Sequence, residues 1–312
     1  MHQLKNVHSL NPEKSSDQYI DGNTKIFGLL GQDLSYSLSF HLHNSAFQHF
    51  GFNSIYVPLI ISDIRQSESF LEGLLHGYTS FMGCNITIPY KTRFVHHELL
   101  QLSTNVKNTL SMNTLIKKGD FWLAENSDIL GFIKSISHID FENRDILILG
   151  AGGVARSVVY ALREEINLNN SIYIFNRTQE KSKILSQKYD LQAITTLQKW
   201  PHKKDGIIIN CTSIGQGTQS SLMSFTDDRP FHKNQIVIDV IYQQTPLLQK
   251  ASRNGAIFYN GLSMLIWQAA ISFSWWTGVS VDECYSYMYQ SYSSMKSSNS
   301  VQHFQQNKKG HF

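Results

Sequence analysis

One stretch of the sequence, residues 145–162 with the letters DILILGAGGVARSVVYAL, constrains the fold more than any other. The apolar run at 145–149 predicts a strand that passes directly into a glycine-rich turn and then into a helical pattern. This order places backbone N–H groups and a helix N-terminus where they can hold a pyrophosphate. A glycine pattern alone also fits a plain tight turn, so the prediction depends on the flanking strand, the helix and the next strand at 171–175. The predicted contact residues are Gly150, Ala151, Gly152, Gly153 and Val154.

The end of that next strand indicates which dinucleotide is bound. Units that bind NAD usually place an acid there for the ribose 2′-hydroxyl, but this chain has Asn176, Arg177 and Thr178. A guanidinium offers a planar set of donors that matches phosphate oxygens. The sequence therefore favours NADP(H) over NAD, although an arginine at this place could also cap the following helix on the surface.

The chain as a whole alternates between short strands and helices. Apolar or β-rich runs occur at 25–30, 54–58, 83–88, 145–149, 171–175, 206–210 and 235–240, and helical patterns occur at 42–50 and 67–75. Such alternation predicts parallel α/β sheets, and 312 residues suit two domains with a cleft between them. The polar segment 137–144 is the candidate boundary between the two domains. Residues 264–281 are predicted to form a buried helix, because the segment is too polar to span a membrane.

Charge and cysteine content narrow the class of protein. The net charge of +3 is spread along the chain without a basic run, so neither nucleic acid nor a membrane is predicted as a partner. Binding of a small anionic ligand remains an open alternative. Three widely spaced cysteines argue against a disulfide framework and for a reducing, cytoplasmic location. The first residues lack the apolar core of a signal peptide, and both ends have the composition of disordered tails.

The segment GCNITIPYKTRF, residues 83–94, ends a predicted strand with a proline and then presents Lys91. Because proline cannot donate to a sheet ladder, the chain must leave the sheet there. Reduction of a carbonyl group needs a hydride on carbon and a proton on oxygen. Lys91 is the candidate proton donor, with a solvated surface lysine as the alternative.

Motifs spread over residues 25–289 resemble those of the shikimate dehydrogenase family, in the family's order. They are GQDLSYSLSFHLHN, NITIPYK, MNTL, ENSDILGF, the glycine loop, NRT, INCTSIG, DVIYQQTPLL and NGLSMLIWQAA. The resemblance implies a two-domain α/β enzyme with a Rossmann-type NADP-binding domain. The expected division of the chain is a disordered tail at 1–24, a substrate-binding and catalytic domain at 25–136, the NADP domain at 137–260, helices at 261–292 that return to the substrate domain, and a disordered tail at 293–312.

The resemblance also implies roles for single residues. It gives Lys91 and Asp128 as the catalytic pair, in which the aspartate stabilises and directs the ammonium. The implied substrate-binding residues are Ser37, Ser39, Asn85, Thr87, Asn113, Tyr242 and Gln268. Beyond the glycine loop and residues 176–178, the implied cofactor-binding residues are Thr212, Ser213, Val240, Gly261 and Met264. Two alternatives from the residues themselves stay open, namely a plain serine-rich turn at Ser37 and Ser39 and a core role for Tyr242.

The chain departs from the family pattern on the substrate side. The positions that differ are Asp33, Tyr36, Phe40, Leu110, Ser111, Met112, Ser127 and Ile129. The expected reaction is the NADPH-dependent, reversible reduction of 3-dehydroshikimate to shikimate, a hydroxylated cyclohexene carboxylate, by a monomer or homodimer without a metal. The departures keep open the alternative of a paralogue acting on quinate or an amino-substituted shikimate. A separate alternative is a regulatory protein that binds the nucleotide without turnover, although the presence of both Lys91 and Asp128 speaks against it.

Overall fold

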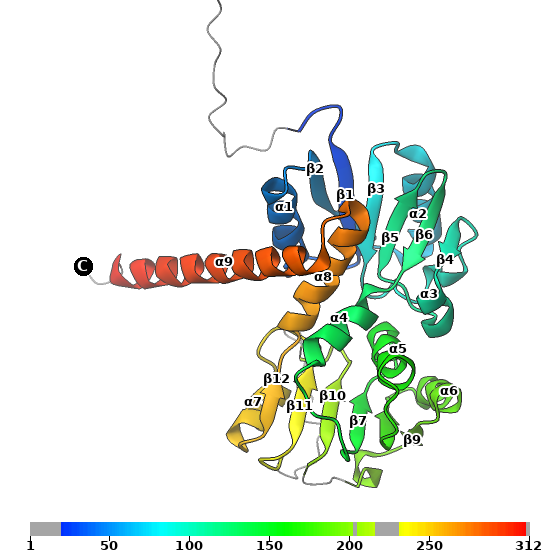
Figure 1. The fold of residues 1–312 in the computed structure, drawn as a ribbon, viewed down its shortest axis with the longest axis vertical. Helices are drawn as coiled ribbons and strands as arrows, with labels where there is room; N and C mark the ends of the chain where they lie inside the picture. The colour runs from blue at the N-terminus through cyan, green and yellow to red at the C-terminus, as the bar shows by residue number, and fades with distance from the viewer. Residues whose placement is uncertain (1–19, 202–204, 216–230, 310–312) are drawn as a thin grey trace, which may run out of the picture.

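The structure, a computed structural model, describes residues 20–201, 205–215 and 231–309, with the backbone alone for 298–309. Two six-stranded sheets lie at opposite ends of the molecule, and helices pack around and between them (Figure 1). The α/β fold predicted from the alternating pattern is therefore confirmed. Among the described residues, no helix is long and apolar enough to cross a membrane.

The first sheet has the strand order β2-β1-β3-β5-β6-β4. Its strands are β1 (Lys25–Gly31), β2 (Ser54–Ile60), β3 (Phe81–Ile86), β4 (Leu100–Leu102), β5 (Thr114–Lys118) and β6 (Phe121–Glu125). Its helices are α1 (Ser39–His49), α2 (Ser67–Gly77), α3 (Thr104–Thr109) and α4 (Ser127–Ile136).

The prediction of wholly parallel sheets is wrong for this sheet. β5 pairs antiparallel with both β3 and β6. Only two residues separate β5 from β6, and Gly119 between them has a φ of 58°. Such a short connection can join only antiparallel strands, because a parallel pair needs a long crossover.

The second sheet is parallel throughout, in the order β12-β11-β10-β7-β8-β9. Its strands are β7 (Ile146–Leu149), β8 (Ile172–Phe175), β9 (Gln192–Ile194), β10 (Ile207–Asn210), β11 (Ile236–Asp239) and β12 (Ile257–Tyr259), and its helices are α5 (Gly153–Tyr160), α6 (Gln179–Tyr189) and α7 (Pro246–Arg253). The order reverses between β7 and β10, which is where nucleotides bind in sheets of this kind.

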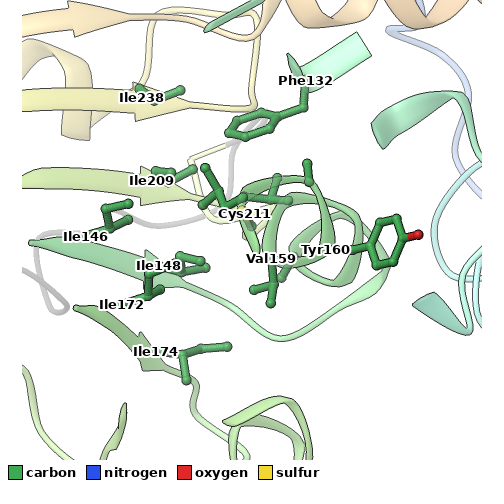
Figure 2. Packing of buried hydrophobic residues seen from close by; sticks show 14 of the residues in the cluster. Phe132, Ile146, Ile148, Val159, Tyr160, Ile172, Ile174, Ile209, Cys211 and Ile238 are labelled. Atoms are coloured by element: carbon green, nitrogen blue, oxygen red, sulfur yellow. The ribbon is translucent and has the colours of Figure 1, made fainter. Parts of the chain in front are cut away.

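The strands of the second sheet are held by an apolar core. Figure 2 shows side chains of four neighbouring strands facing α5 and Phe132 of α4. These residues are Ile146, Ile148, Ile172, Ile174, Ile209 and Ile238, and Val159 of α5 packs against them. Strands buried on both faces explain why the sequence shows continuous apolar runs here.

Two helices lie between the sheets, namely α4 and α8 (Leu262–Thr277) (Figure 1). They cross closely at Gly131, where a Cβ atom would come within 2.9 Å of the Gln268 Cβ and 3.0 Å of its backbone nitrogen. The predicted buried helix is thus present, and it carries residues of the chain's end back to the first sheet. Its Phe273 packs in a core cluster with Phe27 and Phe47.

The ends of the chain differ from the expected tails. Residues 1–19 and 310–312, which fall in those tails, lie outside the described residues. Residues 20–24 form a turn in which the Thr24 hydroxyl donates to Asp21 and Asn53. The last helix, α9 (Val281–Lys309), continues through most of the segment expected to be disordered. Because 281–309 contains neither glycine nor proline, nothing in its local sequence ends the helix.

Candidate active site

Lys91 lies beyond the end of β3, where the chain leaves the sheet as the proline predicts. Its Nζ is 2.7 Å from Oδ2 of Asp128, in the first turn of α4. The two side chains are only 13% and 5% exposed, so the pair is shielded from water. The N-cap residue Asn126 accepts the backbone N–H of Asp128 and sets the start of α4. The structure therefore brings together the two residues that the sequence assigned to catalysis, 37 positions apart.

Asn113 holds the other oxygen of the Asp128 carboxylate. Its Nδ2 donates to Asp128 Oδ1 at 2.9 Å and lies 3.4 Å from Gln268 Oε1. Its Oδ1 accepts the backbone N–H of Ser127 at 2.7 Å, which excludes the flipped amide. With Asn113 on one oxygen and Lys91 on the other, the carboxylate has one defined orientation.

Asn85 is more deeply buried than expected for a residue that contacts the substrate. It is 4% exposed, and its Oδ1 accepts the Tyr56 hydroxyl at 2.8 Å. Its Nδ2 donates to Ser272 Oγ at 2.9 Å and lies 3.2 Å from the Asn113 carbonyl oxygen. The structure thus differs from the expectation at this residue, because both ends of the amide are occupied by protein groups.

Of the two serines expected to bind a carboxylate, Ser37 lies in the loop before α1, and Ser39 is the buried first residue of α1. Ser37 is partly exposed, and its Oγ accepts the backbone N–H of Ser39 at the start of α1. The Tyr242 hydroxyl donates to the carbonyl oxygen of Tyr36 in the same loop. Tyr242 follows β11, so this bond joins the carboxylate loop to the second sheet. Burial raises the pKa of Tyr242, which keeps its hydroxyl a donor.

Thr87 and Gln268 are less deeply buried than Asn85. Both side chains are partly exposed. The backbone N–H of Thr87 donates to the Leu30 carbonyl, so β1 holds its position. Gln268 Nε2 donates to the Leu265 carbonyl, which leaves its oxygen directed at Asn113.

The glycine loop follows β7 and lies close beside Lys91. Gly150 has a φ of 104°, a conformation that favours glycine. A Cβ atom on Gly152 would meet no atom within 4 Å, so space is open above this turn, as a bound pyrophosphate requires. On Gly153, a Cβ atom would lie 2.9 Å from Ser111 Oγ and 3.0 Å from Lys91 Cβ. The start of α5 therefore lies so close to Lys91 and Ser111 that a side chain at position 153 would displace one of them. Ala151 is buried, and Val154 continues the first turn of α5.

The segment after β8 presents its side chains to solvent. Arg177 and Thr178 are exposed, and Asn176 Nδ2 donates to the Thr178 carbonyl at 2.7 Å. This bond closes a turn before α6. The turn leaves Arg177 exposed just after β8, whose Phe175 carbonyl accepts the backbone N–H of Gly150.

The segment after β10 is held by a buried carboxylate. Thr212 donates through its hydroxyl to Asn210 Oδ1 at 2.7 Å, and Asn210 Nδ2 donates to Asp239 Oδ1 at 2.9 Å. Thr245 donates to the second oxygen of Asp239 at 2.7 Å. Burial raises the pKa of Asp239 to about 6. Ser213, next to Thr212, is exposed.

Three of the expected cofactor residues line one cavity of about 300 Å³ beside α4 and α8. They are Val240, Gly261 and Met264. A Cβ atom on Gly261 would lie 2.0 Å from the Val240 carbonyl oxygen, so only glycine fits there. Thr212 and Ser213 are not among the residues that line this cavity.

Several residues that organise the site were not assigned from the sequence. Tyr56, Asn126, Ser157 and Ser272 take part in its buried hydrogen bonds. Ser157 joins α5 to Asn126 at 3.0 Å. The one available signal was a polar residue within an apolar helix, as for Ser272 in AAISFSWW.

Comparison with known families agrees over three consecutive parts of the chain. The shikimate dehydrogenase substrate binding domain matches residues 29–115, the shikimate / quinate 5-dehydrogenase family matches 133–241, and the shikimate 5′-dehydrogenase C-terminal domain matches 261–291.

Individual relatives agree with these matches. The shikimate dehydrogenase (NADP(+)) of Dictyoglomus thermophilum is 35% identical over 270 residues, which cover 83% of this chain and 94% of that protein. The crystal structure of shikimate dehydrogenase from Aquifex aeolicus has a TM-score of 0.76 at 30% identity and covers 88% of this chain and 99% of its own. A shikimate dehydrogenase solved in complex with NADP⁺ has a TM-score of 0.71 at 26% identity, covering 87% and 97%.

Proposed function

The chain belongs to the shikimate dehydrogenase family, and from this premise we propose that it catalyses the NADPH-dependent, reversible reduction of 3-dehydroshikimate to shikimate. The observation that carries the proposal is the shielded Lys91–Asp128 pair at 2.7 Å, which lies close beside the glycine loop at Gly153. This proximity supports Lys91 as a proton donor next to the loop proposed to hold the cofactor. The family and the relatives' names support NADP(H) as that cofactor.

The glycine loop and the residues around it fit a dinucleotide. The positive φ at Gly150 and the open space at Gly152 admit a pyrophosphate against the N-terminus of α5. Arg177 and Thr178 bind the 2′-phosphate of the cofactor. Val240, Gly261 and Met264 line the far side of the cofactor site. When bound, NADPH supplies the hydride for the carbonyl carbon.

Lys91 handles the proton. As the carbonyl oxygen gains negative charge, the Lys91 ammonium donates a proton to it, and in the reverse direction the amine takes the proton back. Asp128 stabilises the charged form of Lys91 and directs its Nζ.

The remaining residues position the ring. Ser37 and Ser39 bind the carboxylate, and Thr87, Asn113 and Gln268 bind hydroxyls. Neutral donors and acceptors suit this task, since an apolar pocket cannot distinguish hydroxylated rings. Tyr242 supports the carboxylate loop through Tyr36.

The identity of the ring is the finer part of the proposal. Four of the positions that depart from the family pattern are fully buried, namely Ser111, Met112, Ser127 and Ile129. Phe40 is partly buried and packs near the Tyr56 ring. Tyr36 is 65% exposed in the carboxylate loop. The buried positions therefore give no reason to prefer quinate or an amino-substituted shikimate. The cytoplasmic location and the state of monomer or homodimer also stay predictions.

The test is oxidation of shikimate, quinate and an amino-substituted shikimate by purified protein with NADP, followed by nicotinamide absorbance. Shikimate is expected to react fastest. Lys91→Ala is expected to lower kcat by roughly a hundredfold or more while NADPH binding is kept. Wild-type activity in the Lys91→Ala variant would disprove its catalytic role. A wild-type protein that binds NADPH but oxidises none of the three rings would instead support the regulatory alternative.

A further inference from the structure

Six buried polar side chains connect the edge of the first sheet to Asp128. We call them the donor chain: Tyr56 of β2, Asn85 of β3, Thr114 of β5, Ser272 of α8, Ser127 of α4 and Asn113 before β5. None is more than 4% exposed. Buried polar groups of this kind must find their hydrogen bonds within the protein, so the direction of each bond can be worked out.

The direction begins at Tyr56. Burial raises the pKa of Tyr56 well above its ordinary value, so its hydroxyl keeps the proton and donates to Asn85 Oδ1 at 2.8 Å. Asn85 Nδ2 lies 3.2 Å from the Asn113 carbonyl oxygen. A flipped Asn85 amide would set two acceptors against each other there, which fixes Nδ2 as the donating side.

Two hydroxyl groups accept hydrogen bonds from Asn85. Asn85 Nδ2 donates to Ser272 Oγ at 2.9 Å and to Thr114 Oγ1 at 3.2 Å. Thr114 Oγ1 in turn donates a hydrogen bond to Asn113 Oδ1 at 3.0 Å. Ser272 Oγ lies 3.0 Å from Ser127 Oγ, which in turn donates to Asn113 Oδ1 at 3.2 Å. The Gln268 carbonyl at 2.9 Å competes for the Ser272 proton, so the Thr114 branch is the more direct of the two.

The chain ends on the carboxylate. Asn113 Oδ1 accepts from both branches and from the Ser127 backbone N–H, and Asn113 Nδ2 donates to Asp128 Oδ1 at 2.9 Å. Donors aligned in series polarise one another in a buried site. Each link therefore strengthens the final bond to the charged form of Asp128.

We propose that Tyr56 is a positioning residue for the reaction, which acts through the donor chain to keep the Asp128 carboxylate turned toward Lys91. This proposal rests on the proposed function, in which these two residues handle the proton. Among the described residues, the titratable groups that face Asp128 are the Lys91 ammonium and the Cys211 thiol. Burial, with nearby Asp239 and Asp128, raises the pKa of Cys211, so the thiol stays neutral.

Tyr56→Phe tests the proposal because it removes one oxygen and keeps the ring, whose centroid lies 4.3 Å from that of His43. Loss of the first donor weakens every later link and lets the Asp128 carboxylate turn away from Lys91. The pH profile of kcat is therefore expected to shift, and kcat near neutral pH to fall about threefold. The KM values for shikimate and NADPH are expected to stay the same.

Tyr90→Phe is the matched control. The Tyr90 hydroxyl is also fully buried and donates at 2.9 Å, but its acceptor is the Ile61 carbonyl, outside the donor chain. Both variants lose one buried hydrogen bond, so a similar drop in Tm is expected. Only Tyr56→Phe is expected to shift the pH profile.

A second variant covers failure of Tyr56→Phe to fold. Ser272→Cys keeps the shape of the side chain, slightly enlarged, at a fully buried position but supplies only a weak donor and acceptor, and a shift in the same direction is expected. If the profiles of the folded variants superpose on that of the wild type, the donor chain has a structural role only and the proposal is wrong. A wild type inactive on shikimate would contradict the proposed function and this proposal together.

Discussion

Asp239 illustrates how one buried side chain shapes a functional segment. Its carboxyl group is fully buried and accepts hydrogen bonds from Asn210, Thr245 and the backbone N–H of Ile241. Through Asn210 it sets the position of Thr212, one of the residues assigned to the cofactor. The three donors favour the charged form, yet burial outweighs them and raises the pKa from 3.8 to about 6.

This pKa predicts a dependence of stability on pH. Between about pH 4 and 6 the folded state holds a proton on Asp239 that the unfolded chain has released. The stabilisation is therefore complete below about pH 4 and is lost as the pH rises through about 6. Asp239→Asn should remove this loss. As the pH rises from about 4 to about 6, the free energy of unfolding of the wild type should therefore fall by at most about 3 kcal/mol relative to that of the variant.

Urea unfolding at pH 4, 5, 6 and 7 measures the difference. Asp120→Asn, which changes an exposed carboxylate at the β5–β6 turn, serves as the control. Parallel curves for the wild type and Asp239→Asn would show that the raised pKa does not hold.

The first turn of α5 combines two requirements in neighbouring glycines. Gly152 faces open space, and Gly153 faces Lys91 and Ser111. The glycine motif predicts a bound nucleotide, but it does not show that one of its residues packs next to Lys91. The same helix therefore serves both halves of the site.

This arrangement predicts different kinetic effects for two similar substitutions. Gly153→Ala should displace Lys91, because its Cβ would lie 3.0 Å from Lys91 Cβ, and should lower kcat by roughly ten- to a hundredfold. Gly152→Ala meets no protein atom, so it should leave Lys91 in place and instead weaken NADPH binding where the pyrophosphate approaches the turn. Steady-state kinetics with titration of NADPH separates the two outcomes. Equal effects of both variants on kcat and on the NADPH Kd would contradict this division.

The molecule is completed by α8 and α9, which return the chain to the first sheet. Cys284 and Met288 of α9 are fully buried in a cluster with Phe47 and Phe273. Farther along, α9 extends away from both sheets (Figure 1). The first part of α9 belongs to the core, while the backbone of its last part lies outside it.

A pair of truncations tests this division. Deletion of residues 298–312 should leave Tm and activity unchanged, since the helix has left the body before that point. Deletion of 281–312 uncovers buried side chains and should cost several kcal/mol of stability, enough to unfold the protein at moderate temperature. Thermal melting of both proteins measures this. A large loss of Tm in the shorter deletion would mean that the end of α9 has a partner.

The sequence by itself determined the local features. The strands from Lys25 to Gly31 and from Ile146 to Leu149, the glycine turn and the buried helix around Met264 follow from neighbouring residues, through apolar periodicity and backbone restrictions. Ordered motifs were also enough to identify the family and to place Lys91 and Asp128. Comparison with known proteins confirms that family and its cofactor.

The tertiary structure alone decided the antiparallel place of β5, the closeness of Gly153 to Lys91 and the internal role of Asn85. These features depend on residues far apart in the chain, such as Asn85 and Ser272, which are 187 positions apart. A hydrogen bond between distant residues leaves no periodic trace in the sequence. It forms only when apolar burial has closed the two sheets and the helices between them, and has left each enclosed polar group to find its partner inside the protein.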